Sequence, residues 1–335
     1  MAAESLLDLR DVKVHFPVGK ALFKPARMLR AVDGVSLSVR RGTSLGIVGE
    51  SGSGKTTLAL AVMRLIDITD GTIILDGVEI SRLTGAELRA QRRHVQMVFQ
   101  DPYSSLNPRS RARDIVAEPL ELMGVGTRAE RAATVDALFR QVGLRVDQMN
   151  LFPHQFSGGQ RQRIGIARAL ATKPSLVVCD EPVSALDVAI QAQILNLLGD
   201  LQREFQLSYL FISHDLAVVQ HLCDEVAVMY LGQIVEQASR DQLFSDPLHP
   251  YTWALLAAVP RMGRRRGENK APALGGDPPS PIELPSGCRF ASRCAFARDI
   301  CRSDTPRLRR MSDGHAVACH LVTDEGRVPH RPEKL

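Results

Sequence analysis

A glycine-rich stretch near the N-terminal end has the residue types and spacing needed to bind phosphate. It fits the pattern G-x-x-x-x-G-K-[ST] with Gly49-Glu50-Ser51-Gly52-Ser53-Gly54-Lys55-Thr56, and Thr57 follows. Its glycines let backbone N–H groups turn toward phosphate oxygens, and the next helix adds a favourable dipole. We expect Lys55 to reach the β- and γ-phosphates and the Thr56 hydroxyl to ligate Mg²⁺. The alternative is a glycine-rich turn that binds nothing, but the apolar run before it and the helical pattern after it favour a nucleotide site.

Two acidic residues later in the chain have the types needed to complete such a site. Asp180 and Glu181 directly follow the apolar run of residues 176–179. We expect Asp180 to hold Mg²⁺, and Glu181, which projects differently, to orient or deprotonate the attacking water. Acidic residues often follow strands, so this pair indicates ATP hydrolysis only in combination with the glycine-rich loop.

A third motif lies between these two and makes the interpretation specific. It opens a predicted helix and reads Phe156-Ser157-Gly158-Gly159-Gln160-Arg161-Gln162-Arg163. This stretch resembles the signature motif of ABC ATPases, with Phe156 where leucine is commoner. The resemblance implies that Ser157, Gly158 and Gly159 present a hydroxyl, backbone donors and a helix N-terminus to the γ-phosphate. Gln160 belongs to the same implied nucleotide-binding set.

Four further residues resemble marks of this family, and they occur in the family's order. Gln100, at the end of a predicted strand, resembles the Q-loop glutamine, which implies roles in catalysis and in Mg²⁺ binding. Asp187 ends a run that resembles the D-loop, and His214 resembles the catalytic switch histidine. Phe16 has the position of the aromatic residue that stacks on adenine, although the neighbouring His15 leaves the register open.

The resemblance implies a mechanism that needs two subunits. In this family two nucleotide-binding domains pack head to tail, and each ATP lies between the P-loop of one and the signature serine of the other. The γ-phosphate is then a ligand that both domains share. Hydrolysis removes this ligand, so closure and reopening of the pair have a physical cause.

The order of predicted elements indicates an α/β fold. Strands and helices alternate, which is typical of a largely parallel, covered sheet. We expect a P-loop NTPase of ABC type with an inserted helical subdomain and a small C-terminal module that contains cysteines. We expect a nucleotide-binding core in two parts, residues 1–100 and 157–260. The helical subdomain, residues 101–156, would lie between them, and an extension, residues 261–335, would follow.

Three features narrow the choice within the family. The chain has a single P-loop and no run of the roughly 18–20 apolar residues that a spanning helix needs, so we do not expect a fused exporter. Residues 100–109 and 248–252 resemble segments of dipeptide and oligopeptide permease ATPases. The insertion at 20–30 resembles that of the second of the two ATPases that those importers use. The resemblance covers roughly residues 5–321 and implies a peptide importer, with nickel and glutathione importers as the alternative.

Location and partners follow from the same resemblance. We see no signal peptide, so we expect a peripheral protein on the cytoplasmic face of the inner membrane. The implied partners are a second ABC ATPase in a heterodimer, two transmembrane permease subunits, which the segment Asp114–Gly143 would contact, and a substrate-binding protein. The net charge of +5 supports a competing hypothesis, a soluble ABC ATPase that acts on nucleic acid. Such proteins generally carry a long coiled coil or two cassettes, so we expect no nucleic-acid partner.

Four cysteines near the C-terminal end have residue types that bind metals. They are spaced as Cys288-x5-Cys294-x6-Cys301-x17-Cys319, among basic and polar residues. In a reducing cytosol such a group favours a metal over disulfides, although zinc sites usually show tighter pairs. The resemblance to peptide-permease ATPases implies a [4Fe–4S] cluster. Zn²⁺ and unligated or disulfide-paired thiols remain alternatives, with His315 and His320 as substitute ligands.

Overall fold

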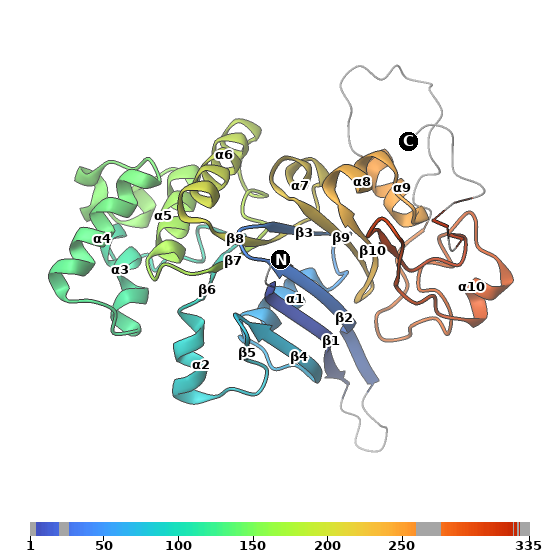
Figure 1. Cartoon of the computed structure of the whole chain (residues 1–335). Coiled ribbons are helices and arrows are strands. Elements are labelled where there is room, and N and C mark those ends of the chain that lie inside the picture. The colour runs from blue at the N-terminus through green and yellow to red at the C-terminus, as the bar shows by residue number, and fades with distance from the viewer. Residues whose placement is uncertain (1–4, 20–26, 259–275, 324, 327, 329–335) are drawn as a thin grey trace.

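The computed structural model describes residues 5–19, 27–258, 276–323, 325–326 and 328. Most of the insertion predicted at residues 20–30 and the first part of the C-terminal extension, residues 261–275, lie outside the described residues. Two β-sheets and the helices between and around them make up the described structure (Figure 1).

The larger sheet positions the site, because its central strands are parallel and end at the same edge. Its order is β11-β12-β10-β9-β3-β8-β7-β6. The parallel strands are β3 (Ser44–Val48), β6 (Val95–Val98), β7 (Leu176–Asp180), β8 (Ser208–Ser213) and β9 (Glu225–Tyr230). Strands β3, β7 and β8 are buried along their whole length, as expected for apolar runs in a sheet covered on both faces. Antiparallel strands complete one side: β10 (Gln233–Ser239), β11 (Arg309–Arg310) and β12 (Ala316–Val317).

The smaller sheet is antiparallel and has the order β2-β1-β4-β5. Its strands are β1 (Ser5–Val18), β2 (Arg27–Arg40), β4 (Asp70–Leu75) and β5 (Val78–Glu79). Helix α1 (Lys55–Val62) contacts strands of both sheets, and one apolar core joins all three. Helix α1 ends at Val62, because Arg64 has a φ of 52°, in the left-handed region that an α-helix excludes.

A group of helices lies at the β6 end of the larger sheet (Figure 1). It contains α3 (Ala112–Leu122), α4 (Arg128–Gln141) and α5 (Gly158–Leu170), and α5 contacts the other two. A capping box between Thr127 and Glu130 begins α4. The remaining helices are α2 (Gly85–Arg92), α6 (Val188–Phe205), α7 (Leu216–Leu222), α8 (Arg240–Ser245), α9 (Pro250–Ala258) and α10 (Asp299–Ser303). None of the helices within the described ranges is both long and apolar enough to span a bilayer.

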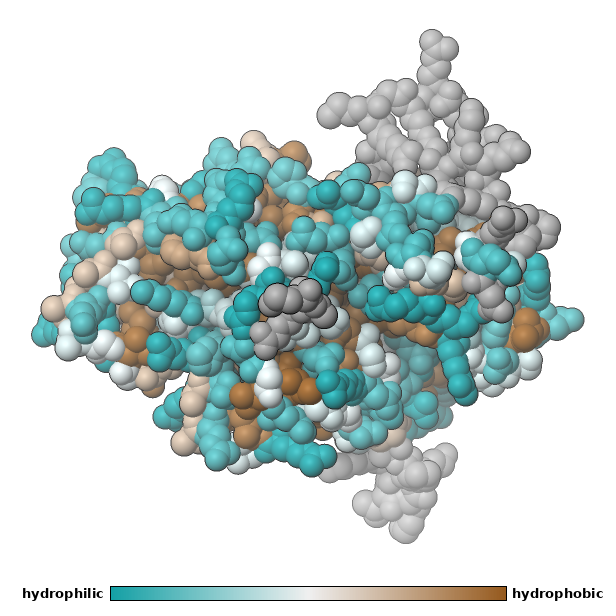
Figure 2. All heavy atoms as spheres, viewed as in Figure 1, coloured by the Kyte–Doolittle hydropathy of each residue, from teal (hydrophilic) through white to brown (hydrophobic). Residues whose placement is uncertain are grey.

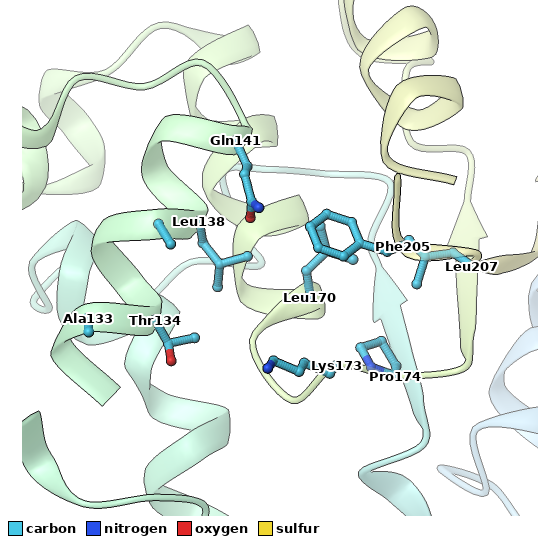
Figure 3. A pocket seen from close by; sticks show the side chains of 10 residues that line it. Ala133, Thr134, Leu138, Gln141, Leu170, Lys173, Pro174, Phe205 and Leu207 are labelled. Carbon is cyan, nitrogen blue, oxygen red and sulfur yellow. The ribbon is translucent and has the colours of Figure 1, made fainter. Parts of the chain in front are cut away.

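Most of the face seen in Figure 2 is hydrophilic, with apolar atoms between the polar ones. One apolar pocket of about 540 Å³ lies between α4 and the segments that precede β7 and β8 (Figure 3). Leu138, Leu170, Phe205 and Leu207 contribute to its wall. It lies at the amino ends of the parallel strands, whereas the glycine-rich loop follows the carboxyl end of β3, so this pocket is separate from the predicted nucleotide site.

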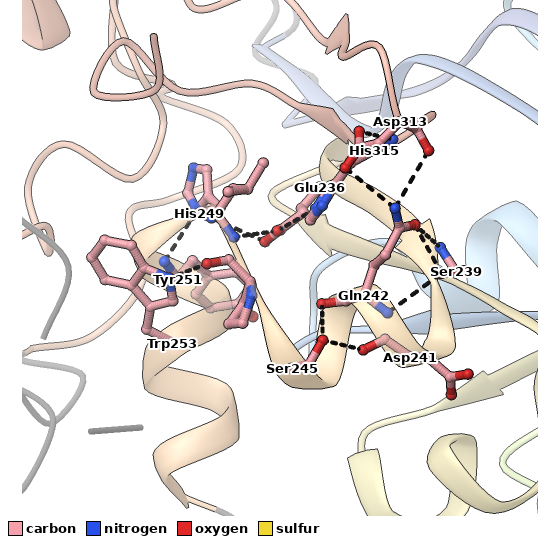
Figure 4. A network of polar contacts seen from close by, with 12 residues as sticks. Glu236, Ser239, Asp241, Gln242, Ser245, His249, Tyr251, Trp253, Asp313 and His315 are labelled. Atoms are coloured by element: carbon pink, nitrogen blue, oxygen red, sulfur yellow. Dashed lines mark hydrogen bonds and ion pairs between the residues drawn. The ribbon is translucent and has the colours of Figure 1, made fainter. Parts of the chain in front are cut away.

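A buried polar network fastens the C-terminal residues to β10 (Figure 4). Glu236 is fully buried, and its carboxylate accepts hydrogen bonds from the backbone N–H groups of Leu248 and His249. The same carboxylate lies 2.8 Å from Nε2 of His315, next to β12. Nδ1 of His249 in turn accepts a hydrogen bond from the backbone N–H of Tyr251 at 3.0 Å.

We predict that mild acid lowers the free energy of unfolding because of His249, a member of this network. Burial lowers the pKa of His249 to about 4, although Glu236 opposes the shift. The unfolded chain takes up this proton near pH 6.5, so lowering the pH from 6.5 to 4 favours the unfolded state. The expected loss is on the order of 3 kcal/mol in the free energy of unfolding. Denaturant titrations should show a shallower pH dependence for His249→Asn, whose carbonyl can replace Nδ1. Equal slopes in the two proteins would contradict this account.

Candidate nucleotide site

The glycine-rich loop has backbone geometry that only glycine tolerates at two positions. Gly49 and Gly54 have φ values of 155° and 105°. A Cβ atom at Gly49 would lie 2.2 Å from the carbonyl oxygen of Met229, and one at Gly54 would lie 2.0 Å from that of Ala31. The loop is therefore held closely between β9 and β2, and α1 begins directly after it.

Lys55 lies inside this loop and is bound by it. Its Nζ atom donates to the carbonyl oxygens of Gly49 and Glu50, each at 2.8 Å. The residue is only 5% exposed. Burial lowers the pKa of Lys55, while Glu181, Asp180 and Glu50 act in the opposite direction. The amine is thus buried and held by the loop in the wall of a pocket.

The parallel strands bring the other predicted residues to the same edge. Gln100 follows β6, Asp180 ends β7, His214 follows β8, and the glycine-rich loop follows β3. These four strands are neighbours in the sheet, and their carboxyl ends point the same way. Ligand sites of open α/β sheets are found at this edge.

Thr56 and Asp180 lie next to each other, as a shared cation would require. The Thr56 hydroxyl donates to Oδ1 of Asp180 at 3.2 Å. Burial raises the pKa of Asp180, and the hydrogen bond from Thr56 partly offsets this. A hydroxyl and a carboxylate are hard oxygen ligands of the kind that Mg²⁺ prefers, so these side chains fit that ion. Gln100 lines one pocket together with Thr56, but its side-chain amide donates a hydrogen bond to Glu181.

Glu181 is the centre of a three-residue contact. Nε2 of Gln100 donates to its Oε2 at 2.9 Å, and Nδ1 of His214 lies 3.0 Å from its Oε1. Glu181 has a φ of 47°, in the left-handed region, and its N–H donates to the carbonyl oxygen of Ile212. This sparsely populated backbone conformation holds the Glu181 carboxylate between its two polar partners, Gln100 and His214.

One open pocket of about 790 Å³ is lined by most of these side chains, whereas Asp180 is not part of its wall. Its wall includes the glycine-rich loop, Gln100, Glu181 and His214, together with Leu29, Ala31, Leu255 and Pro281. Phe16 is absent from this wall, but it pairs with Leu29 across β1 and β2. Paired residues of antiparallel strands point to the same face, so Phe16 lies beside the pocket.

Two residues of the pocket wall, Leu255 and Pro281, belong to no motif that predicts a nucleotide site from the sequence. Leu255 belongs to α9, and Pro281 belongs to the segment after the undescribed residues 259–275. The carbonyl oxygen of Pro281 accepts a hydrogen bond from the N–H of Arg30 at the start of β2. Neither residue is chemically reactive, and only the folding of the C-terminal region over β2 brings them to the site.

The signature residues form a separate element. Ser157 is the N-cap of α5, and its hydroxyl accepts from the N–H of Gln160 in a capping box. Gly159 packs so closely on Ile190 of α6 that an added Cβ would lie 2.6 Å from that side chain. Asp187 caps α6 in the same way by accepting from Ile190 N. The wall of the nucleotide pocket does not include Ser157, Gly158, Gly159, Gln160 or Asp187.

The predicted four-cysteine ligand set is not found in the structure. Within the described ranges, no three or more His, Cys, Asp and Glu side chains are grouped so that they could hold a metal ion. Burial raises the pKa of Cys294 to about 11 and of Cys319 to about 12, and it also raises the pKa of Cys288.

The other candidate ligands of that module have partners of their own. Sγ of Cys301 accepts from the N–H of Arg298 at the start of α10. His315 is bound to Glu236, and His320 lies 3.0 Å from the carbonyl oxygen of Asp304. A metal centre at the four cysteines therefore stays a prediction.

Comparisons with known proteins agree with this geometry. The profile of the ABC transporter family matches residues 32–184, and the profile of the oligopeptide/dipeptide transporter C-terminal region matches residues 235–301. The oligopeptide transport ATP-binding protein AppF of Bacillus subtilis is 50% identical over 96% of this chain and 98% of its own. The di/tripeptide transport ATP-binding protein DppF of Pseudomonas aeruginosa is 47% identical over 95% and 98%.

Solved structures give the same result for the fold. An ATP-binding cassette crystallised as a dimer in a post-hydrolysis state with ADP and Pi has a TM-score of 0.62 and is 28% identical. The match covers 70% of this chain and 98% of that one. Together with the arrangement of Lys55, Asp180 and Glu181, these matches identify the chain as an ABC-type ATPase, a member of the ATP-binding proteins of oligopeptide and dipeptide ABC transporters.

Proposed function

We propose that this chain hydrolyses ATP to drive the import of dipeptides or oligopeptides through partner membrane subunits. The observation that carries the proposal is the contact of Glu181 with both Gln100 and His214 in the wall of the pocket that Lys55 also lines. The names of the relatives, which describe oligopeptide and di/tripeptide transport, support peptides as the cargo.

Each residue has a role in this proposal. Lys55 and the loop N–H groups bind the β- and γ-phosphates, and Thr56 and Asp180, with Gln100, would hold Mg²⁺. The ion, when bound, neutralises charge on the phosphates. Glu181 accepts a proton from water as the water oxygen attacks the γ-phosphorus and the bond to the ADP oxygen breaks. Gln100 and His214 hold the Glu181 carboxylate in position for this transfer.

A second ABC ATPase completes the site in this proposal. Ser157 and the two glycines after it form the amino end of α5, where backbone N–H groups and the dipole favour an anion. They would bind the γ-phosphate held by the P-loop of the partner subunit. Asp187, at the amino end of α6, would lie near the same interface.

We predict that Ser157→Arg stops hydrolysis while it spares binding. The arginine would obstruct the approach of the partner, so the ATPase rate of the assembled complex should fall at least about tenfold, while the Kd for MgATP stays near that of the parent. Ser239→Arg is the matched control, because Ser239 caps α8 with the same capping box away from the pocket. Full hydrolysis by Ser157→Arg would rule out this shared site.

The same proposal includes the location and the remaining partners. We place the chain on the cytoplasmic face of the inner membrane, in contact with two permease subunits through the helical subdomain and served by a substrate-binding protein. The division of the chain at residues 100, 156 and 260 is part of this proposal.

Stimulation of the ATPase rate by a peptide, but not by nickel or glutathione, would distinguish the cargoes. No nucleic acid takes part.

A [4Fe–4S] cluster, or Zn²⁺ as the alternative, at the four cysteines rests on their residue type and spacing and on the resemblance to peptide-permease ATPases, and it stays a prediction. Its ligands would be Cys288, Cys294, Cys301 and Cys319. No step of the proposed mechanism uses such a group. Iron, zinc and sulfide analysis of protein purified without oxygen decides the matter, and a folded protein without any of them would end that prediction.

A further inference from the structure

The phosphate-binding loop contains an acidic residue, Glu50, directly after Gly49. Glu50 lines the nucleotide pocket, and its negative charge acts on the Lys55 amine. A carboxylate at this place repels the phosphates of a nucleotide. The loop therefore needs something that offsets this charge.

A residue far along the chain meets this need. Arg293 donates two hydrogen bonds to the Glu50 carboxylate, from Nη1 to Oε2 at 2.6 Å and from Nη2 to Oε1 at 2.9 Å. Its side chain is only 5% exposed, and that of Glu50 is 28% exposed. Paired hydrogen bonds from guanidinium to carboxylate fix orientation as well as charge. Arg293 is thus a directed and desolvated partner.

Arg293 is itself held by an aromatic cluster. Its backbone N–H donates to the carbonyl oxygen of Phe290, whose ring lies 5.3 Å from that of Tyr230 and 5.4 Å from that of Tyr251. Tyr251 also reaches the loop directly, because its hydroxyl accepts from the backbone N–H of Glu50 at 2.8 Å. Glu50 is therefore bound at its N–H and at its carboxylate by residues of the C-terminal part of the chain.

A second connection runs from the same segment to the loop. Arg289 donates to the carbonyl oxygen of Leu231 and to the carboxylate of Asp33. The next residue, Gly232, donates its N–H to the carbonyl oxygen of Ser53 at 2.8 Å. Two arginines four residues apart thus touch the loop and the turn that supports it.

We infer that Arg293 is a positioning residue of the nucleotide site, which neutralises and fixes Glu50 so that the loop can accept a triphosphate. The C-terminal module, residues 286–321, then contributes to ATP affinity in addition to any role in assembly. The inference rests on the proposed ATP binding at Lys55.

The test is a set of equilibrium titrations with MgATP on the full chain. Arg293→Met exposes the phosphates to an unpaired Glu50 charge, so we expect the Kd to rise roughly tenfold. In the assembled complex the KM for ATP should rise while kcat stays within about twofold, because the Glu181 contacts are untouched. Adding Glu50→Gln to Arg293→Met removes the unpaired charge and should restore the Kd to within about threefold of the parent.

The rescue separates electrostatics from simple structural damage. A module that had come loose would not be repaired by a change in the loop, and Arg293→Lys, which keeps the charge without the paired geometry, should give an intermediate Kd. Arg302→Met is the matched control, since Arg302 is an exposed arginine of the same module. An unchanged Kd in Arg293→Met, or a double variant as weak as the single one, would overturn the inference. Failure of the parent to bind MgATP would instead remove the proposed function on which it rests.

Discussion

Replacement of Glu181 by glutamine is expected to lower the ATPase rate of the assembled complex about a hundredfold to a thousandfold. Glutamine has the same shape but cannot accept the proton of the attacking water. The backbone conformation at this position and the hydrogen bond from Gln100 remain available to the new side chain. Binding of MgATP should persist, so the variant should accumulate a closed, ATP-bound pair of subunits.

Steady-state phosphate release and size-exclusion chromatography with and without MgATP measure these two effects. Glu204→Gln is a suitable control, because Glu204 is an exposed carboxylate of α6 with one hydrogen bond, to Gln141. If Glu181→Gln hydrolyses ATP as fast as the parent, the carboxylate is not the proton acceptor.

Replacement of Lys55 by alanine is expected to weaken MgATP binding about a hundredfold or more. A charged donor to phosphate contributes roughly 1.5–3 kcal/mol per hydrogen bond, and the Lys55 amine has no substitute among the residues of the pocket wall. Thermal unfolding gives a direct measure. MgATP at about 100 times its Kd should stabilise the parent by roughly 2.7 kcal/mol, and this shift should vanish in Lys55→Ala.

The nucleotide-free variant should unfold near the temperature of the parent. The hydrogen bonds that the Lys55 amine makes to described residues go to loop atoms, and its loss leaves two carbonyl oxygens of residues that line the open pocket. Lys173→Ala controls for the change of charge, since Lys173 is exposed and far from the loop in the sequence. A full nucleotide-dependent shift in Lys55→Ala would contradict the assignment of this amine.

The sequence predicted most of the nucleotide core because its signals are local. An apolar run, a glycine loop and a helical pattern follow one another at β3 and α1, so each element indicates the next. Gln100, Glu181 and His214 are far apart in the chain, yet each follows an apolar run. Parallel pairing of β6, β7 and β8 then brings them to one edge.

The contribution of the C-terminal region could not be predicted in this way. Arg293 reaches Glu50 across more than two hundred residues of sequence, and nothing in either neighbourhood distinguishes this arginine from the exposed ones around it. The cysteines show the opposite problem. Their spacing is a local signal that predicts a metal centre, but the burial of the thiols and the hydrogen bond that Cys301 accepts from Arg298 are set by the fold and could not be read from that spacing.

The hydrogen bonds of Lys55 to its own loop set a threshold for ligands. The ammonium group has two carbonyl partners in its own loop, each at 2.8 Å. An incoming anion must displace these contacts, so its net gain is the difference between the new and the old interactions. Small monoanions present too little charge to win this exchange, whereas a triphosphate contacts the ammonium group and the backbone donors together. The loop should therefore bind a nucleotide triphosphate in preference to chloride.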